Sequence, residues 1–432
     1  MTHKHPPQSS PIQLTQFITV PRLQQAKSAT IESHLSAESW LADARLVKSV
    51  YIHVPFCFHK CHYCDFYSIA GGEDQYDDFI NQLSTELEYV GEHLNDIETI
   101  FVGGGTPTIF DINLFDAMLH AIATYIPRTQ TCEWTIEANP ETVTGDKANA
   151  MALNGVNRVS IGAQSFDLGL LKALERWHDP SSVTRAVEFV RDAGIENINL
   201  DIIYAIPTET ELQLQQDLSQ VLALRPTHLS CYSLIYEPNT PLRTRLDRGD
   251  VQRIAHELEA TMFDTVREVL LSEGYEHYEI SNFAKSGYTC KHNIAYWTDQ
   301  SWWPFGPSAS GHLAGRRWKN TPRISDYICG SPLPPIVDVE RLCPDRSAGE
   351  SFMVGLRMLQ GMEERWVETL IEQSTNNWRR DVIEQYIQQG LLQWQDSQLS
   401  LTLKGLRYAD TVILALLMQD ETMTDTNEQL AP

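Results

Sequence analysis

Three cysteines stand close together in residues 57–66 and could hold an inorganic cluster. Cys57, Cys61 and Cys64 have the spacing C-x3-C-x2-C. Three thiolates on one loop can bind three irons of a cubane [4Fe–4S] cluster, whereas most protein clusters use four cysteines. The fourth iron would then be open to a small-molecule ligand. We therefore predict a [4Fe–4S] cluster on this loop.

Zinc is the alternative occupant of the same loop. A zinc site needs a fourth Cys or His nearby, and His59 and His62 lie within the loop, so the spacing alone does not exclude zinc. Side chains that flank cluster ligands usually only shield the cluster, which favours iron and sulfur here. The remaining cysteines are scattered along the chain and are interpreted mostly as small buried hydrophobic residues.

The composition limits the classes of partner. The chain has 57 acidic and 33 basic residues, a net charge of −24, which repels phosphate backbones and excludes nucleic acid as an expected partner. A local, peripheral contact with a membrane is compatible with this charge. No stretch approaches the roughly 18 apolar residues of a membrane span, and the first 30 residues lack the apolar core of a secretory signal. With eight cysteines, these features lead us to expect a reducing compartment, the cytoplasm.

Strand and helix patterns alternate from residue 47 onward. Such alternation indicates an α/β fold with a parallel sheet, and six strand–helix units fit an incomplete (β/α)6 barrel. Active sites of such barrels lie at the carboxyl ends of the strands. The strands are expected at 47–54, 97–102, 133–138, 157–161, 198–203 and 228–234, with a further strand at 275–280, and the helices at 74–94, 114–125, 183–193, 212–224 and 254–272.

Polar and glycine-rich segments follow these predicted strands. Residues 103–105 are three glycines, whose backbone can approach a ligand closely, although such a run can also form a simple turn. Glu137, Gln164 and Asp201 lie at or near strand ends, where buried polar groups need partners such as an ammonium or ribose hydroxyls. Hydrogen bonding within the fold explains each of the three equally well. Arg176 could pair with a carboxylate, but on sequence alone a surface charge is slightly favoured.

The cysteine spacing, with Tyr63 just before the last cysteine, resembles the radical S-adenosylmethionine (SAM) superfamily. The resemblance implies that the open iron binds the amino and carboxylate groups of SAM. It also implies that an electron from the cluster splits the sulfonium to give a 5′-deoxyadenosyl radical.

Residues 47–420 are similar in more detail to the oxygen-independent coproporphyrinogen III oxidase family. The similarity rests on the segments YIHVPFC, CHYCDF, GGGTPT, IEANPE, RVSIGAQSFD, NLDIIYAIP, YSLIYEPNTPL and YEISNFA. It implies SAM-binding roles for Tyr51, Tyr63, Gly104, Gly105, Thr106, Glu137, Gln164, Arg176 and Asp201.

Two marks favour the haem chaperone (HemW) branch of that family. The oxidases have a further cysteine two residues after the third cluster cysteine, where this chain has Phe66, and residues 292–297 match the H-N-x-x-Y-W motif of the chaperones. The resemblance implies a protein that binds haem and transfers it to apo-haemoproteins, with SAM cleavage supported by a small reductant such as a flavodoxin. His292 is the expected axial haem ligand, and Cys290 competes for that role.

Two other functions stay open. One is an enzyme that oxidatively decarboxylates two propionates of coproporphyrinogen III, and the other is a radical enzyme acting on an unrelated substrate. We expect SAM cleavage without coproporphyrinogen oxidase activity. The chain departs from the family pattern at Ala205, Ser308 and Ser310, where the family has glycine, glycine and histidine.

We expect four regions along the chain. They are a loosely ordered extension at 1–42, with one helix around 32–45; the radical SAM barrel at 43–284; a connecting segment with the HNxxYW motif at 285–335; and a mostly helical C-terminal domain of the HemW type at 336–432. The last contains helices at 350–359, 367–372 and 378–388 and a hairpin near 390–405, and resembles a winged helix. Winged helices often bind DNA, but the acidic charge argues against this here.

Overall fold

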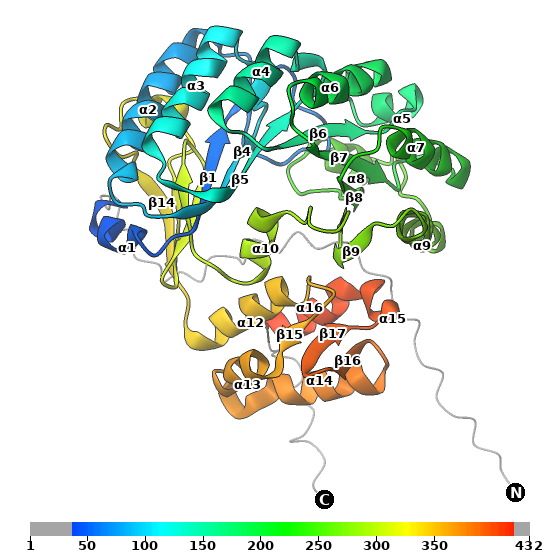
Figure 1. Ribbon diagram of the computed structural model, residues 1–432. Coiled ribbons are helices and arrows are strands. Elements are labelled where there is room, and N and C mark those ends of the chain that lie inside the picture. Colours follow the sequence, from blue (N-terminus) through cyan, green and yellow to red (C-terminus); the bar gives the residue numbers. More distant parts are fainter. Residues whose placement is uncertain (1–36, 419–432) are drawn as a thin grey trace, which may run out of the picture.

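The computed structural model describes residues 37–418 as one large mixed sheet covered by helices, with a smaller domain beneath it (Figure 1). The predicted extension at 1–42 therefore lies almost wholly outside the described residues, as does the chain after 418. Of the helix expected around 32–45, the described part is a 3₁₀ turn at Ala37–Trp40 followed by α1 (Leu41–Ala44). Within residues 37–418, no helix is long and apolar enough to cross a membrane.

Six parallel strands form the centre of the sheet and confirm the predicted α/β fold. Their order in the sheet is their order in the chain, and the two edges of the sheet do not pair with each other, so the barrel is open. The strands are β1 (Ser49–Val54), β4 (Ile97–Gly104), β5 (Arg128–Ala138), β6 (Arg158–Gln164), β7 (Asn197–Tyr204) and β8 (His228–Ser233). The connecting helices are α2 (Tyr76–Gly91), α3 (Ile112–Tyr125), α4 (Gly145–Asn154), α6 (Pro180–Asp192), α7 (Glu211–Ala223) and α9 (His256–Ser272), with the short α5 (Leu168–Ala173) and α8 (Pro241–Asp247).

Local signals explain where these helices begin. The carboxylate of Asp111 accepts hydrogen bonds from the backbone N–H groups of Asn113 and Leu114 at the start of α3. Thr210 and Gln213 form a capping box at the start of α7. At the end of α4, Gly155 has a φ of 101°, the left-handed conformation that glycine adopts at least cost.

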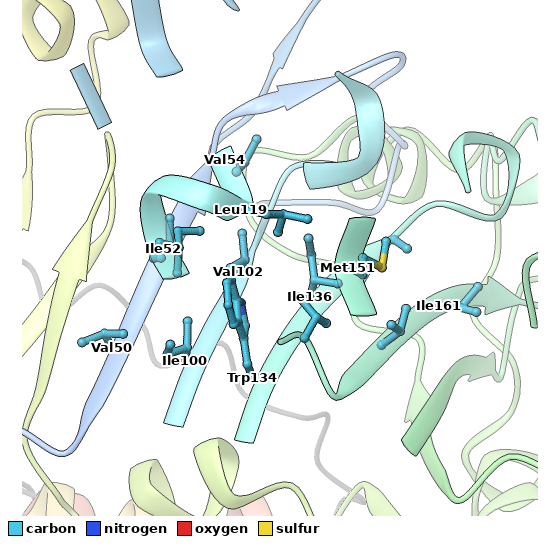
Figure 2. Packing of buried hydrophobic residues seen from close by; sticks show 14 of the residues in the cluster. Val50, Ile52, Val54, Ile100, Val102, Leu119, Trp134, Ile136, Met151 and Ile161 are labelled. Carbon is cyan, nitrogen blue, oxygen red and sulfur yellow. The ribbon is translucent and has the colours of Figure 1, made fainter. Parts of the chain in front are cut away.

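The side chains of the central strands alternate between two environments. Val50, Ile52, Ile100, Trp134 and Ile161 point away from the barrel interior and pack with Leu119 of α3 and Met151 of α4 (Figure 2). The positions between them face the interior and are largely polar: Ser49, His53, Thr99, Glu133, Thr135, Glu137, Arg158, Ser160, Asn199, Asp201, His228 and Ser230. The outer apolar layer therefore stabilises the fold, and the polar interior is available to bind a ligand.

Further strands extend the sheet at both edges. Beyond β8 lie β10 (Asn282–Ala284) and β9 (Glu276–Glu279), both antiparallel to their neighbours. On the other side β11 pairs in parallel with β1 and is followed by three antiparallel strands, so the expected connecting segment contributes directly to this sheet. These elements are α10 (Lys291–Trp297), β11 (Trp302–Phe305), β12 (Ser310–Leu313), β13 (Arg316–Asn320), α11 (Ile324–Ile328) and β14 (Ile336–Arg341).

The C-terminal domain has the expected mostly helical, winged-helix-like composition. It contains α12 (Pro344–Gly355), α13 (Glu364–Glu372), α14 (Trp378–Gln388), α15 (Leu403–Leu406) and α16 (Ala409–Leu417), with a small sheet of β15 (Met362–Glu363), β17 (Gln398–Leu401) and β16 (Leu392–Gln395). It packs beneath the barrel sheet, where the backbone N–H of Ile280 donates to the carbonyl of Arg357 at 3.1 Å and Arg317 pairs with Glu350 at 2.7 Å.

Candidate functional site

The three cysteines lie in a loop that starts at the carboxyl end of β1. The loop is closed by the two-residue strands β2 (Phe56–Cys57) and β3 (Ile69–Ala70), which pair in parallel. On its far side, the N–H of Leu242 at the start of α8 donates to the carbonyl of His62 at 2.9 Å. Cys61 is buried, and Cys57 and Cys64 are partly exposed. The fold therefore fixes both ends of the cysteine loop and anchors its middle.

Hydrogen-bond donors from the barrel point at two of the sulfur atoms. The hydroxyl of Thr106 donates to Cys57 Sγ at 3.7 Å, and Arg176 Nη1 donates to Cys61 Sγ at 3.6 Å. Burial raises the pKa of Cys57 and raises the pKa of Cys64 to about 12, so both thiols carry protons until a metal displaces them. Donors directed at sulfur stabilise thiolate ligands. This set of groups fits a [4Fe–4S] cluster held by three thiolates.

A single metal ion, such as zinc, needs several protein ligands close to one point. Among residues 37–418, no three His, Cys, Asp or Glu side chains converge closely enough to hold one metal ion.

The three glycines at the end of β4 (Gly103 and Gly104 within it, Gly105 just after it) run directly beside the cysteine loop. The N–H of Gly105 donates to the carbonyl of Val54 at 2.7 Å. A Cβ on Gly103 would stand 2.5 Å from the Glu137 carboxylate, and one on Gly104, whose φ is 101°, would stand 2.3 Å from the ring of His53. Side chains at these positions would therefore displace groups that the site uses.

Two acidic side chains face the interior close to this segment. Glu137 Oε2 accepts a hydrogen bond from the N–H of Gly104 at 2.9 Å. Burial, and then the charge of Asp201, raise the pKa of Glu137 to about 7. Asp201 accepts hydrogen bonds from Asn199 Nδ2 at 2.8 Å and Ser160 Oγ at 3.4 Å, and burial raises its pKa also. Two partly buried carboxyl groups that face the barrel interior suit a ligand that carries an ammonium and hydroxyl groups.

The remaining predicted residues gather around the same end of the barrel. Arg176 Nη2 donates to the carbonyl of Gly162 at 3.0 Å, and a Cβ at Gly162 would lie 2.9 Å from Gln164 Nε2. Burial raises the pKa of Tyr63, as do the nearby thiols and Asp201. On β1, the hydroxyl of Tyr51 lies 3.0 Å from His53 Nδ1. Arg176 and Thr106 thus contact the cysteine loop through Cys61 and Cys57, and Glu137 contacts the glycine segment.

His292 lies elsewhere, near the amino ends of β4 and β5. Its side chain is 1% exposed. Its Nδ1 lies 2.8 Å from Thr99 Oγ1, its Nε2 lies 2.9 Å from the hydroxyl of Tyr296, and its ring stacks on Phe101 at 5.1 Å. Both ring nitrogens are therefore occupied, and in this arrangement neither is available to a haem iron.

The competing ligand Cys290 is also enclosed. It has no exposed surface, its thiol donates to Glu133, and burial raises its pKa to about 12. The Glu133 carboxylate also accepts the backbone N–H groups of Lys291 and His292, each at 3.2 Å, and so holds the start of α10. Sequence reasoning missed Glu133, Ser160 and Asn199, and the period-two pattern of β5, β6 and β7 is the signal that would have found them.

Comparison with known families identifies two segments. Residues 51–221 match the Radical SAM superfamily, and residues 344–408 match the HemN C-terminal domain. The first segment contains the cysteine loop and the interior carboxylates, and the second corresponds to the domain beneath the barrel.

Several curated relatives are similar over most of their length. The heme chaperone HemW of Lactococcus lactis is 33% identical over 86% of this chain and 98% of its own length. The heme chaperone HemW of Bacillus subtilis is 32% identical over 86% of this chain and 99% of its own. Among solved structures, the coproporphyrinogen III oxidase HemN from Escherichia coli superposes with a TM-score of 0.76, covering 90% of this chain and 95% of that one. At 17% identity, this last likeness is one of fold.

Proposed function

This chain belongs to the HemW family of heme chaperones within the radical SAM superfamily, and from that premise we propose that it binds haem and transfers it to apo-haemoproteins. The observation that carries the proposal is the similarity to HemW over almost the whole length of those relatives. Phe66, which stands where the oxidases have a cysteine, supports the chaperone over the oxidase. Family membership implies a [4Fe–4S] cluster and SAM as cofactors.

We propose that Cys57, Cys61 and Cys64 hold the cluster and that the interior groups around Glu137 and Asp201 hold SAM. When bound, the cluster and SAM supply one-electron chemistry. The chain itself would orient SAM through the glycine backbone, the two carboxylates and Arg176, and would keep water away by burial. A small flavodoxin-type reductant, a cytoplasmic location and a peripheral membrane contact belong to the same proposal. An electron donor would have to approach the cysteine loop, where Phe58 and Phe66 are exposed.

Incubation with coproporphyrinogen III tests the function against its rival. Anaerobic protein with a reconstituted cluster, SAM and dithionite is expected to release 5′-deoxyadenosine slowly and to form no protoporphyrinogen IX. The nucleoside product serves as an internal control, since it shows that the cluster is active in the same tube. The same preparation should bind about one haem per chain, as a Soret titration would show. Protoporphyrinogen IX formed with repeated turnover would identify an oxidase instead.

The pH dependence of SAM binding tests Glu137. Because its pKa is about 7 in the free protein, raising the pH from 6 to 8 ionises the carboxyl and should strengthen SAM binding several-fold. The same raised pKa means that Glu137 stabilises the free fold most below its unfolded pKa and loses that contribution as the pH rises through 7. Glu137→Gln should bind SAM more weakly and with a flatter pH profile, measured by anaerobic calorimetry on cluster-loaded protein. Exposed Glu98 gives the control, Glu98→Gln, and an unchanged slope in Glu137→Gln would remove this group from the site.

A further inference from the structure

Haem iron is commonly held by an imidazole or a thiolate, and neither His292 on α10 nor Cys290 just before it is accessible. Ligation by His292 would require the loss of its contacts with Thr99 and Tyr296, and ligation by Cys290 would require the loss of its contact with Glu133. The haem-binding function proposed above therefore leaves the identity of the ligand open.

His312 on β12 differs from His292, because hydrogen bonds within the described residues do not occupy both of its ring nitrogens. Its side chain is 17% exposed, and its Nδ1 lies 3.8 Å from the carboxylate of Asp299. Among the described residues, its Nε2 has no hydrogen-bond partner. This separation is longer than a hydrogen bond, so the carboxylate lies beside the imidazole, and the Nε2 lone pair is left available to a metal.

An aromatic side chain accompanies this imidazole. Trp302 pairs with His312 across β11 and β12, and their ring centroids are 5.2 Å apart. The ring of Tyr296 lies a further 4.6 Å from that of Trp302. Flat apolar neighbours of this kind suit a porphyrin.

The same face of the sheet also carries a cation. Ser310, which pairs with Lys319, lies two residues before His312, so all three side chains are on one face of β12 and β13. Lys319 has no ion pair among residues 37–418, and its charge contributes to lowering the pKa of His53 inside the barrel, after burial. A propionate is the complementary group.

This face continues the interior surface of the barrel. β11 pairs with β1 so that Trp302 lies opposite Ser49 and Pro304 lies opposite Tyr51.

We propose that His312 is the axial ligand of the haem, with Trp302 against the porphyrin and Lys319 on a propionate. The proposal rests on the haem-binding function and assigns its ligand. Asp299 acts through His312 and is a positioning residue. The site lies at the edge of the barrel next to α12, whose Ser351 donates to Asp299 at 2.6 Å.

Ferric haem titrations of the full chain test this assignment. His312→Ala should weaken binding by roughly tenfold or more and shift the Soret band, and added imidazole should restore the band. Asp299→Asn should weaken binding less, and Lys319→Arg should bind better than Lys319→Met. His292→Ala and Cys290→Ala should leave the band in place, as should His120→Ala at an exposed position on α3. Circular dichroism and SAM binding would establish that each variant is folded.

The possible outcomes distinguish a wrong assignment of the axial ligand from a failure of the proposed haem-binding function. A Soret shift in His292→Ala or Cys290→Ala, with none in His312→Ala, would overturn the assignment and leave haem binding intact. If none of these variants changes haem binding, the assignment of His312 is likewise overturned, and haem binding itself stands. Failure of the unaltered chain to bind haem at all would remove both the assignment and the proposed function.

Discussion

Replacing Cys61 by alanine is expected to abolish the iron–sulfur cluster. The two remaining thiols of the loop cannot hold a cubane, and the cysteines elsewhere in the chain lie outside this loop. Cys61 is buried and receives a hydrogen bond from Nη1 of Arg176, so its loss also removes the partner of that one donor. We expect the same outcome for Cys57→Ala and Cys64→Ala, because in the proposed cluster each thiolate would bind a different iron.

Anaerobic reconstitution followed by iron and sulfide analysis measures this effect. The unaltered chain should hold about four irons, and each loop variant should hold close to none. Exposed Cys329 supplies the matched control, since Cys329→Ala should keep the full iron content and the visible charge-transfer absorption of the cluster. Stoichiometric zinc in anaerobically purified protein would favour the alternative occupant of the loop.

Replacing Arg379 by alanine is expected to destabilise the C-terminal domain by about 3–5 kcal/mol. Its side chain is fully buried and connects three parts of the domain. Nη1 donates to the Asp345 carboxylate at 2.7 Å, and Nε donates to the carbonyl of Leu416 at 2.8 Å. It also donates to Ser374 and to the carbonyl of Leu417. Alanine would leave the carbonyls at the end of α16 unpaired in the interior.

The adjacent residue provides the control for this prediction. Arg380 is exposed and pairs with Glu368 on the surface, so Arg380→Ala should change stability by no more than about 1 kcal/mol. Hydrogen exchange over residues 344–417 would report the domain separately from the barrel. Equal protection in the two variants would mean that the buried network contributes little.

The barrel strands were predictable because each combines apolar residues with a turn signal. The sequence indicated all six parallel strands and five of the helices that follow them at nearly the observed positions, and the helix at 378–388 has the predicted bounds. By contrast α4 went unpredicted, since its inner face is made of small residues such as Ala148 and gives little periodicity. Strands β11 to β14 went unpredicted because they are short and take their stability from pairing with β1, a long-range contact that local patterns do not contain.

The candidate site likewise contains residues that local sequence patterns reveal and residues that they do not. The cysteines, the glycine segment and Glu137 stand in distinctive local patterns, so the sequence could single them out. Thr99 and Asn199 are ordinary residue types whose roles depend on neighbours distant in the chain. For His292, the motif predicted a ligand, while the structure gives both of its ring nitrogens to hydrogen bonds within the protein. A motif can indicate that residues belong together without indicating what they bind.

The alternation of side chains along the barrel strands has a consequence for how such a protein can diverge. Neighbouring residues such as Ile136 and Glu137 have different roles: Ile136 packs in the apolar layer, and Glu137 faces the barrel interior, where it accepts a hydrogen bond from Gly104. Substitutions at the inward positions can change chemistry while the apolar layer remains intact. A single-residue insertion or deletion within a strand would exchange the two sets and damage both at once. Descendants of this fold should therefore differ in the strands by replacement, and in length only in the loops between them.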